Sequence, residues 1–324
     1  MKYILIIVTA WLFLPLAVRA TESPAKQGSR SQTQPSQQPV KPGLTKPFLW
    51  RVENPRGKAC YAFGSIHLAE KRVVAGWSKT LKDIFRNADA VYFEIPFDQE
   101  TLAKVDQVMR TPGNSLAKLL PTDLYSRTEA KLKQIAPTMK LELFDELKPV
   151  AFGVKLFALE IAQQGPVPMD FLLYKQMANI PGKTVGGLES VEEQAVAFYC
   201  LTPSEEIEVL RASLDYMDAC NQRGTSAFDE INNAYLSGDL EKLMATMNSS
   251  MMSGVPETTI RKFNDALLTN RNRRLAERMA KKMKEHQNQT QVFVLGAAHY
   301  AEPHGVLDLL RQDGFKISRV TEFQ

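Results

Sequence analysis

Two segments near opposite ends of the chain share one pattern: a short apolar strand runs into a glycine, and a histidine follows three residues later. The first segment, ACYAFGSIH, ends at His67, and the second, QVFVLGAAH, ends at His299. Each is followed by a predicted loop, helix and strand. After His67, the helix is predicted over 77–87 and the strand over 90–95. After His299, the helix is predicted over 305–312 and the strand over 315–320. The chain has four histidines, so the equivalent places of two of them are its strongest functional indication.

This duplication predicts the fold class. We expect an α/β (α+β) fold in which two βαβ-like units, each carrying a strand–GxxH turn, form mixed sheets flanked by helices. Between them lies a large helical insertion, with helix starts at Pro121 and Pro149 and a long amphipathic helix over 263–286. Neither half has enough strands to be stable alone. Residues 47–324 are therefore predicted to form a single domain.

The N-terminal residues read as a targeting segment. Residues 1–20 combine a lysine, an apolar core and a small-x-small end, which is typical of a cleaved secretory signal peptide. An uncleaved anchor is the alternative, but the apolar run is short for a membrane span and contains Pro15. Residues 21–46 are rich in Gln, Ser and Pro, which predicts a disordered linker. We expect a secreted or periplasmic protein with no integral membrane span after signal cleavage.

Charge and cysteine content exclude some functions and leave others open. The net charge is +4, and the basic residues gather over 271–284 without a nucleic-acid recognition motif, so no nucleic-acid partner is expected. The three cysteines suit an oxidising compartment. Cys200 and Cys220 could form a disulfide with Cys60 left as a buried thiol, or all three could be buried thiols. No cysteine–histidine pattern indicates a thiol nucleophile.

The strand ends carry the residues that could do chemistry. Ligands of open α/β sheets bind at the carboxyl ends of the strands, and His67, His299 and Glu94 all follow predicted strands. Two histidines and one carboxylate suit a divalent transition metal with open positions for water and substrate. Glu94 could instead be the general base that activates the water. The structural alternatives are hydrogen-bonded histidines and a solvent-facing glutamate.

Two further places are candidates for substrate contacts. Glu189 ends the predicted strand in KTVGGLES and could reach the same edge, or it could be a first-turn charge of the following helix. Arg271 and Asn272 could bind a substrate carboxylate or orient an oxyanion, or they could belong to a solvated charged face.

Taken together, these motifs resemble the TraB/GumN family, which includes the Tiki-type metalloproteases. The resemblance rests on YAFGSIH, DAVYFEIP, MDFLLYKQMA, KTVGGLESVEEQ, NRNRRLAERM and VFVLGAAHYAEPHGV in this order. It implies paired βαβ units related to erythromycin-esterase-like and haem-binding ChaN-like proteins. It also implies a divalent metal held by His67, His299 and Glu94, with manganese or cobalt favoured over zinc.

The resemblance also assigns the supporting residues. The arginine–asparagine pair of the family corresponds to Arg271 and Asn272, and its LE-x-x-x-x-Q element corresponds to Glu189 and Gln194. One departure is Glu302, which stands where family members commonly have glycine. An extra carboxylate and His304 beside the site could alter metal choice or access.

The sequence supports two hypotheses of different classes. In the first, the protein is a metal-dependent hydrolase, a peptidase acting on a peptide or protein substrate, with catalytic residues His67, Glu94, Arg271, Asn272 and His299. In the second, it is a non-catalytic protein that binds or sequesters a peptide, haem or a metal through the same histidines. Retained ligand without turnover would favour the second.

Overall fold

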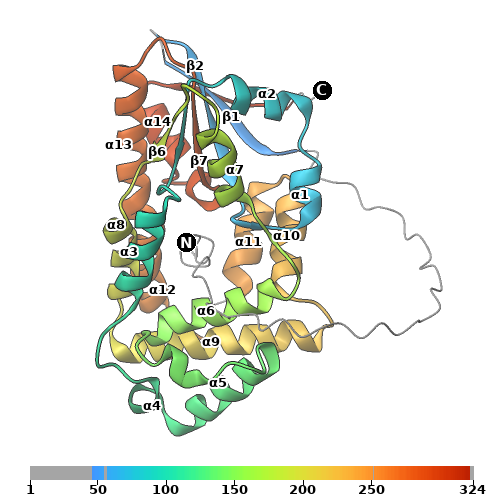
Figure 1. The fold of residues 1–324 in the computed structure, drawn as a ribbon, viewed down its shortest axis with the longest axis vertical. Coiled ribbons are helices and arrows are strands. Elements are labelled where there is room, and N and C mark those ends of the chain that lie inside the picture. The colour runs from blue at the N-terminus through green and yellow to red at the C-terminus, as the bar shows by residue number, and fades with distance from the viewer. Residues whose placement is uncertain (1–45, 55–56, 251, 322–324) are drawn as a thin grey trace, which may run out of the picture.

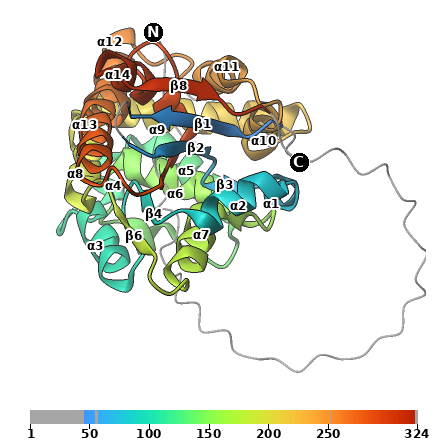
Figure 2. The ribbon, with the colours of Figure 1, turned by 90° about the horizontal axis from the view of Figure 1, so that it is seen from above.

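The strand that leads to His299 lies inside a six-stranded sheet in the computed structural model, which describes residues 46–54, 57–250 and 252–321. The predicted signal segment 1–20 and the linker up to residue 45 lie outside the described residues. The strands follow one another across the sheet as β6 (Thr184–Gly187), β4 (Ala90–Phe93), β7 (Gln291–Gly296), β2 (Ala59–Ser65), β1 (Phe48–Glu53) and β8 (Lys316–Arg319). Figure 2 shows β8, β1 and β2 side by side and β4 and β6 at the opposite end.

The sheet is mixed because one strand runs against the others. Strands β6, β4, β7 and β2 pair in parallel, whereas β1 is antiparallel to both β2 and β8. Every residue of β7 and β4 is buried, as expected of parallel strands that are covered on both faces. The predicted α/β class with helix-flanked mixed strands is confirmed, and the strands of the two units interleave in this one sheet.

The two units have the expected connections. Strand β2 leads through α2 (Lys79–Asn87) to β4, and β7 leads through α14 (Val306–Gln312) to β8. The strands predicted at 90–95 and 315–320 are shorter than expected. The helix predicted from residue 77 begins at Lys79, because the Ser78 hydroxyl accepts a hydrogen bond from the Leu81 amide and caps it. A short helix before it, α1 (Lys71–Ala75), was not predicted.

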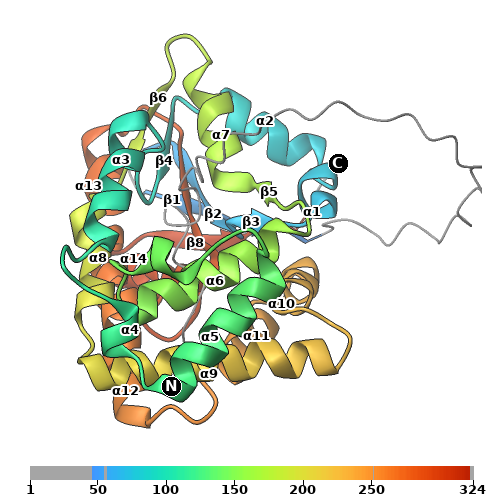
Figure 3. The same ribbon diagram turned by 60° about the horizontal axis from the view of Figure 1, so that its bottom comes forward.

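The helical middle packs largely on itself, and α7 (Met169–Ala178) contacts β4 and β6 of the sheet. Its helices are α3 (Gln99–Met109), α4 (Leu116–Leu119), α5 (Thr122–Ile135), η2 (Leu141–Phe144), α6 (Pro149–Ala162), α7 (Met169–Ala178), α8 (Val191–Tyr199), α9 (Pro203–Gln222), α10 (Ala227–Leu236) and α11 (Leu240–Ser250). The predicted starts at Pro121 and Pro149 are confirmed to within a residue. Helix α6 is apolar apart from Lys155 and Glu160, and it is almost entirely buried. Figures 1 and 3 show α5, α6 and α9 at the end of the molecule opposite the sheet.

The amphipathic helix near the C-terminus differs from the prediction. It begins at α12 (Glu257–Asn264), passes through the π-helical turn η3 (Asp265–Thr269) and continues as α13 (Asn270–Glu285). A π turn inserts an extra residue per turn and so rotates the residues that follow it. Arg271 and Asn272 lie directly after η3 and are buried. The prediction that they could belong to a solvated face is therefore wrong.

Three smaller features complete the fold. A two-stranded sheet pairs β3 (Leu68–Ala69) with β5 (Val167–Pro168), and it was not predicted. Cys60, Cys200 and Cys220 are free thiols, so the alternative disulfide between Cys200 and Cys220 is not formed. Within the described ranges, none of the helices is both long and apolar enough for a membrane crossing.

Candidate metal-binding site

Three neighbouring strands deliver their following residues to one edge of the sheet. Strand β7 lies between β4 and β2, and all three run in the same direction. Glu94 follows β4, His67 follows β2, and His299 lies in the 3-10 turn η4 (Ala297–Tyr300) after β7. The Oε1 atom of Glu94 is 3.9 Å from Nε2 of His67 and 3.7 Å from Nε2 of His299. The three residues that were singled out from their strand-end positions therefore meet.

Each histidine is held by a hydrogen bond at Nδ1. The Nδ1 of His67 lies 2.5 Å from Oδ2 of Asp170, and the Nδ1 of His299 lies 2.6 Å from Oδ1 of Asn272. The amide of Asn272 is oriented by its other end, since Nδ2 donates to the carbonyl of His304 at 3.1 Å. Oxygen therefore faces the His299 ring. Because both partners are acceptors, each ring donates from Nδ1, and in its neutral form it presents the Nε2 lone pair to Glu94.

The lone pairs of two imidazole nitrogens and one carboxylate oxygen thus face the centre of the site. Neither Nε2 atom has a hydrogen-bond partner among the described residues, and both are buried. Oε1 of Glu94 accepts a hydrogen bond from the Gly296 amide at 2.7 Å, but no donor separates it from the two nitrogens. Three acceptors that face one another repel unless a cation or a proton lies between them.

Gly296 leaves the room that this arrangement needs. A Cβ at this position would stand 2.9 Å from Nε2 of His67 and 3.3 Å from Oε1 of Glu94. The first distance is too short for any side chain. Glycine is therefore required here, because the backbone passes close to the side chains of His67 and Glu94.

The electrostatics of the site favour an ionised Glu94 beside a neutral His299. Burial raises the pKa of Glu94, but the positive charge of Arg271, the interactions with His299 and His67 and the hydrogen bond from the Gly296 amide outweigh it and lower the pKa to about 2. Burial lowers the pKa of His299 to about 3, with the charge of Arg271 acting in the same direction and that of Glu94 against it. At neutral pH, His299 is an uncharged imidazole beside a carboxylate, which is the form in which both groups bind metals.

A buried ionic network fixes the other oxygen of Glu94. Oε2 accepts from Nη2 of Arg271 at 2.6 Å and from the side-chain amide of Gln194 at 3.2 Å. Arg271 also donates from Nε to Oε2 of Glu189 at 2.8 Å, and Arg274 donates to the other oxygen of Glu189 at 3.0 Å. All three donor nitrogens of the Arg271 guanidinium have partners within the protein, since Nη1 donates to the backbone.

This network changes the interpretation of the predicted substrate contacts. Arg271 is 1% exposed and Glu189 is 5% exposed, and they bond to each other and to Glu94. Contact of Arg271 or Glu189 with a substrate stays a prediction. The geometry instead supports a role in holding Glu94, and the same holds for Asn272 with respect to His299.

The donor set fits a divalent cation with a small adjustment. Two ligands about 2.1 Å from one ion stand about 3–3.5 Å apart. The distances of 3.7 and 3.9 Å from Oε1 of Glu94 to the two Nε2 atoms are slightly longer than this. Accordingly, in the described part of the chain no three His, Cys, Asp or Glu side chains already stand close enough together to hold a metal ion. Two orphaned imidazole nitrogens and one ionised oxygen nonetheless provide the ligand types that a transition metal prefers.

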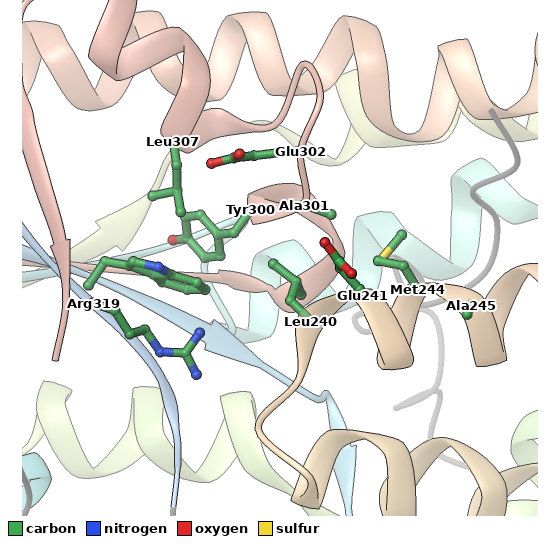
Figure 4. Close-up of a pocket in the computed structure, with 10 residues that line it drawn as sticks. Leu240, Glu241, Met244, Ala245, Tyr300, Ala301, Glu302, Leu307 and Arg319 are labelled. Atoms are coloured by element: carbon green, nitrogen blue, oxygen red, sulfur yellow. The ribbon is translucent and has the colours of Figure 1, made fainter. Parts of the chain in front are cut away.

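Glu302 does not add a carboxylate to this set. It forms ion pairs with Arg311 and lines a separate cavity of about 490 Å³ with residues of α11, β1 and β8. Figure 4 shows Glu302 and Glu241 on the walls of this cavity beside Tyr300. The exposed ring of His304 belongs to the same loop. The expectation that Glu302 and His304 would alter the metal site directly is therefore not supported by their positions, although the backbone of His304 holds Asn272.

Sequence reasoning missed Asp170 and Ser65. Both are buried, and the hydroxyl of Ser65 donates to Oδ2 of Asp170 at 3.0 Å. Ser65 lies in the first GxxH motif, and Asp170 lies in the MDFLLYKQMA motif. The signal that could have identified Asp170 is an acidic residue in the first turn of a helix, followed directly by the apolar residues 171–173.

The chain is similar in sequence to known proteins. The sequence model described as the TraB/PrgY/gumN family matches residues 48–319. Metalloprotease TIKI2 of Danio rerio is 26% identical, over 89% of this chain and 64% of its own length. Metalloprotease TIKI1 of Homo sapiens is 24% identical, over 95% of this chain and 68% of its own length. No solved structure matches. The chain thus spans about two thirds or less of the length of most of the curated relatives that it matches.

Proposed function

The chain belongs to the TraB/PrgY/gumN family, and from this premise we propose that it is a metal-dependent hydrolase that cleaves peptide bonds in a peptide or protein substrate. The relatives at 22–26% identity are named metalloproteases. One observation carries the proposal: two buried imidazole nitrogens without hydrogen-bond partners converge on an ionised carboxylate oxygen.

His67, His299 and Glu94 would hold the metal through Nε2, Nε2 and Oε1. A divalent transition metal bound there supplies a polarised water and a Lewis acid for the scissile carbonyl. Manganese or cobalt is the expected ion, by family resemblance. The site would act outside the cytoplasm, in a secreted or periplasmic protein, as the sequence of residues 1–20 suggests.

The protein's own residues prepare this site in advance. Asp170 and Asn272 keep the Nδ1 protons in place, so that both Nε2 atoms stay free as donors. Arg271 neutralises and orients Glu94. With a pKa of about 2, Glu94 is a poor proton acceptor at neutral pH, which favours its role as a ligand over that of a general base.

The proposal is tested by turnover of peptide pools at neutral pH. We expect cleavage by the purified chain loaded with Mn²⁺ or Co²⁺, loss of cleavage after treatment with a chelator, and recovery when the ion is returned. His299→Ala should lose activity, whereas His286→Ala, which alters an exposed histidine, should keep it. An active His299→Ala variant would refute the proposal. Bound metal without cleavage of any pool would favour the binding protein that the same donors would also allow.

A further inference from the structure

The two histidines of the candidate site differ in what holds them. The Nδ1–H of His67 donates to a carboxylate, whereas that of His299 donates to a neutral amide. A hydrogen bond to an ionised acceptor is shorter and stronger than one to a neutral acceptor. It also raises the basicity of the opposite ring nitrogen when the histidine binds a metal. The two Nε2 donors are therefore unequal although both are buried.

Backbone pairing between two short segments places Asp170 for this contact. The segment after His67 forms β3 and pairs with β5, directly before Asp170. The amide of Met169 donates to the backbone carbonyl of His67 at 3.0 Å. Two backbone links thus fix the first turn of α7 against the first GxxH turn. The N-terminus of this ten-residue helix also favours a negative charge in its first turn.

The hydrogen bonds of Asp170 also indicate a role in holding His67. Oδ2 accepts from both His67 and Ser65, and these are its hydrogen-bond partners in the part of the chain that the structure describes. Oδ1 is buried without a partner there. A buried acceptor without a partner destabilises the fold. A contact that served only to stabilise the fold would not need this arrangement.

We propose that Asp170, braced by Ser65, is a positioning residue that orients His67 and strengthens its Nε2 as a metal donor, so that His67 is the stronger of the two imidazole ligands. This inference rests on the metal site of the proposed function. Asp170 itself does not touch the metal or the substrate.

The test is titration of the metal-free full-length chain with Co²⁺, followed by visible absorption. Asp170→Asn keeps the size of the side chain and converts the partner of His67 into the kind of partner that His299 has. We expect its Co²⁺ affinity to fall about 10–100-fold, as is typical when the hydrogen-bond partner of a ligating histidine is lost. The absorption spectrum of the bound ion should also change.

A matched control separates this effect from general damage to the fold. Asp98→Asn alters an aspartate that caps α3 and should leave Co²⁺ binding unchanged, because asparagine caps helices as well as aspartate does. Ser65→Ala removes one of the two hydrogen bonds to Oδ2 and should weaken binding by a smaller factor. It also serves as the second test if Asp170→Asn does not fold.

The outcomes distinguish the inference from the proposed function. If the wild-type chain binds Co²⁺ and folded Asp170→Asn binds it within about threefold as tightly with the same spectrum, Asp170 does not act on the metal and the inference is wrong, while the metal site stands. Equal binding by wild type and Ser65→Ala would contradict it in the same way if the first variant fails to fold. If the wild-type chain binds no Co²⁺, the metal site itself and the inference both fail.

Discussion

Substituting Arg271 with methionine would remove a positive charge that two buried carboxylates share. Arg271 is 1% exposed, and its Nη2 lies 2.6 Å from Glu94 and 2.7 Å from Glu189. Methionine fills much of the same volume but leaves both carboxylates without this partner. Removing one member of a buried ion pair costs about 3–5 kcal/mol. Since domains are stable by about 5–15 kcal/mol in all, we expect a large loss of unfolding free energy.

The assay is urea unfolding of the metal-free chain, followed by the fluorescence of its tryptophans. Arg274→Met is the matched control, because Arg274 contacts Glu189 at 3.0 Å from a side chain that is 33% exposed. Because the Arg274 side chain is partly solvated, its removal should cost less than removal of the fully buried Arg271. Adding Glu94→Gln and Glu189→Gln to Arg271→Met should recover part of the loss. An Arg271→Met variant as stable as Arg274→Met would show that the carboxylates do not depend on Arg271.

Three further predictions concern the site and the thiols. Gly296→Ala should abolish metal binding, measured by titration, because the added Cβ would stand 2.9 Å from Nε2 of His67. The control Gly186→Ala should bind metal normally, since its Cβ would make only ordinary contacts of 3.7 Å or more. Equal metal affinities of the two variants would contradict the predicted crowding. Acid should destabilise the metal-free chain by several kcal/mol. The pKa values of His299 and Glu94 are lower in the folded state, so the unfolded chain takes up protons first as the pH falls. The stability that depends on a neutral His299 is complete above about pH 6.5 and is lost as the pH falls to about 3. The stability that depends on an ionised Glu94 is lost between about pH 4.5 and 2. A urea midpoint that is unchanged between pH 7.5 and 4.5 would refute this. Finally, a thiol reagent should count three free cysteines in the denatured chain without reductant, and fewer would mean a disulfide.

The sequence was sufficient to bring His67, His299 and Glu94 together. The reason is that short apolar runs mark strands by themselves, and the rule that parallel strands present their carboxyl ends at one edge needs no knowledge of strand order. The family resemblance added Gln194, which carries no chemical signal when its segment is read alone.

The remaining parts depend on contacts between residues distant in the chain. Asp170 reaches His67 through pairing of two-residue strands, which are too short to leave a periodic pattern. The π turn before Arg271 depends on packing around it, and an arginine on a basic helix reads as exposed until the partners Glu94 and Glu189 are placed. The position of Glu302 likewise depends on Arg311, with which it pairs away from the site.

The most direct measurement is the metal content of the purified chain, determined by mass spectrometry after loading with manganese, cobalt or zinc and removal of free ions. We predict about one equivalent of a divalent transition metal in the wild type and in His286→Ala, and loss of this metal in His67→Ala. A wild-type chain without metal, or a His67→Ala variant that keeps as much metal as the wild type, would contradict the site described here.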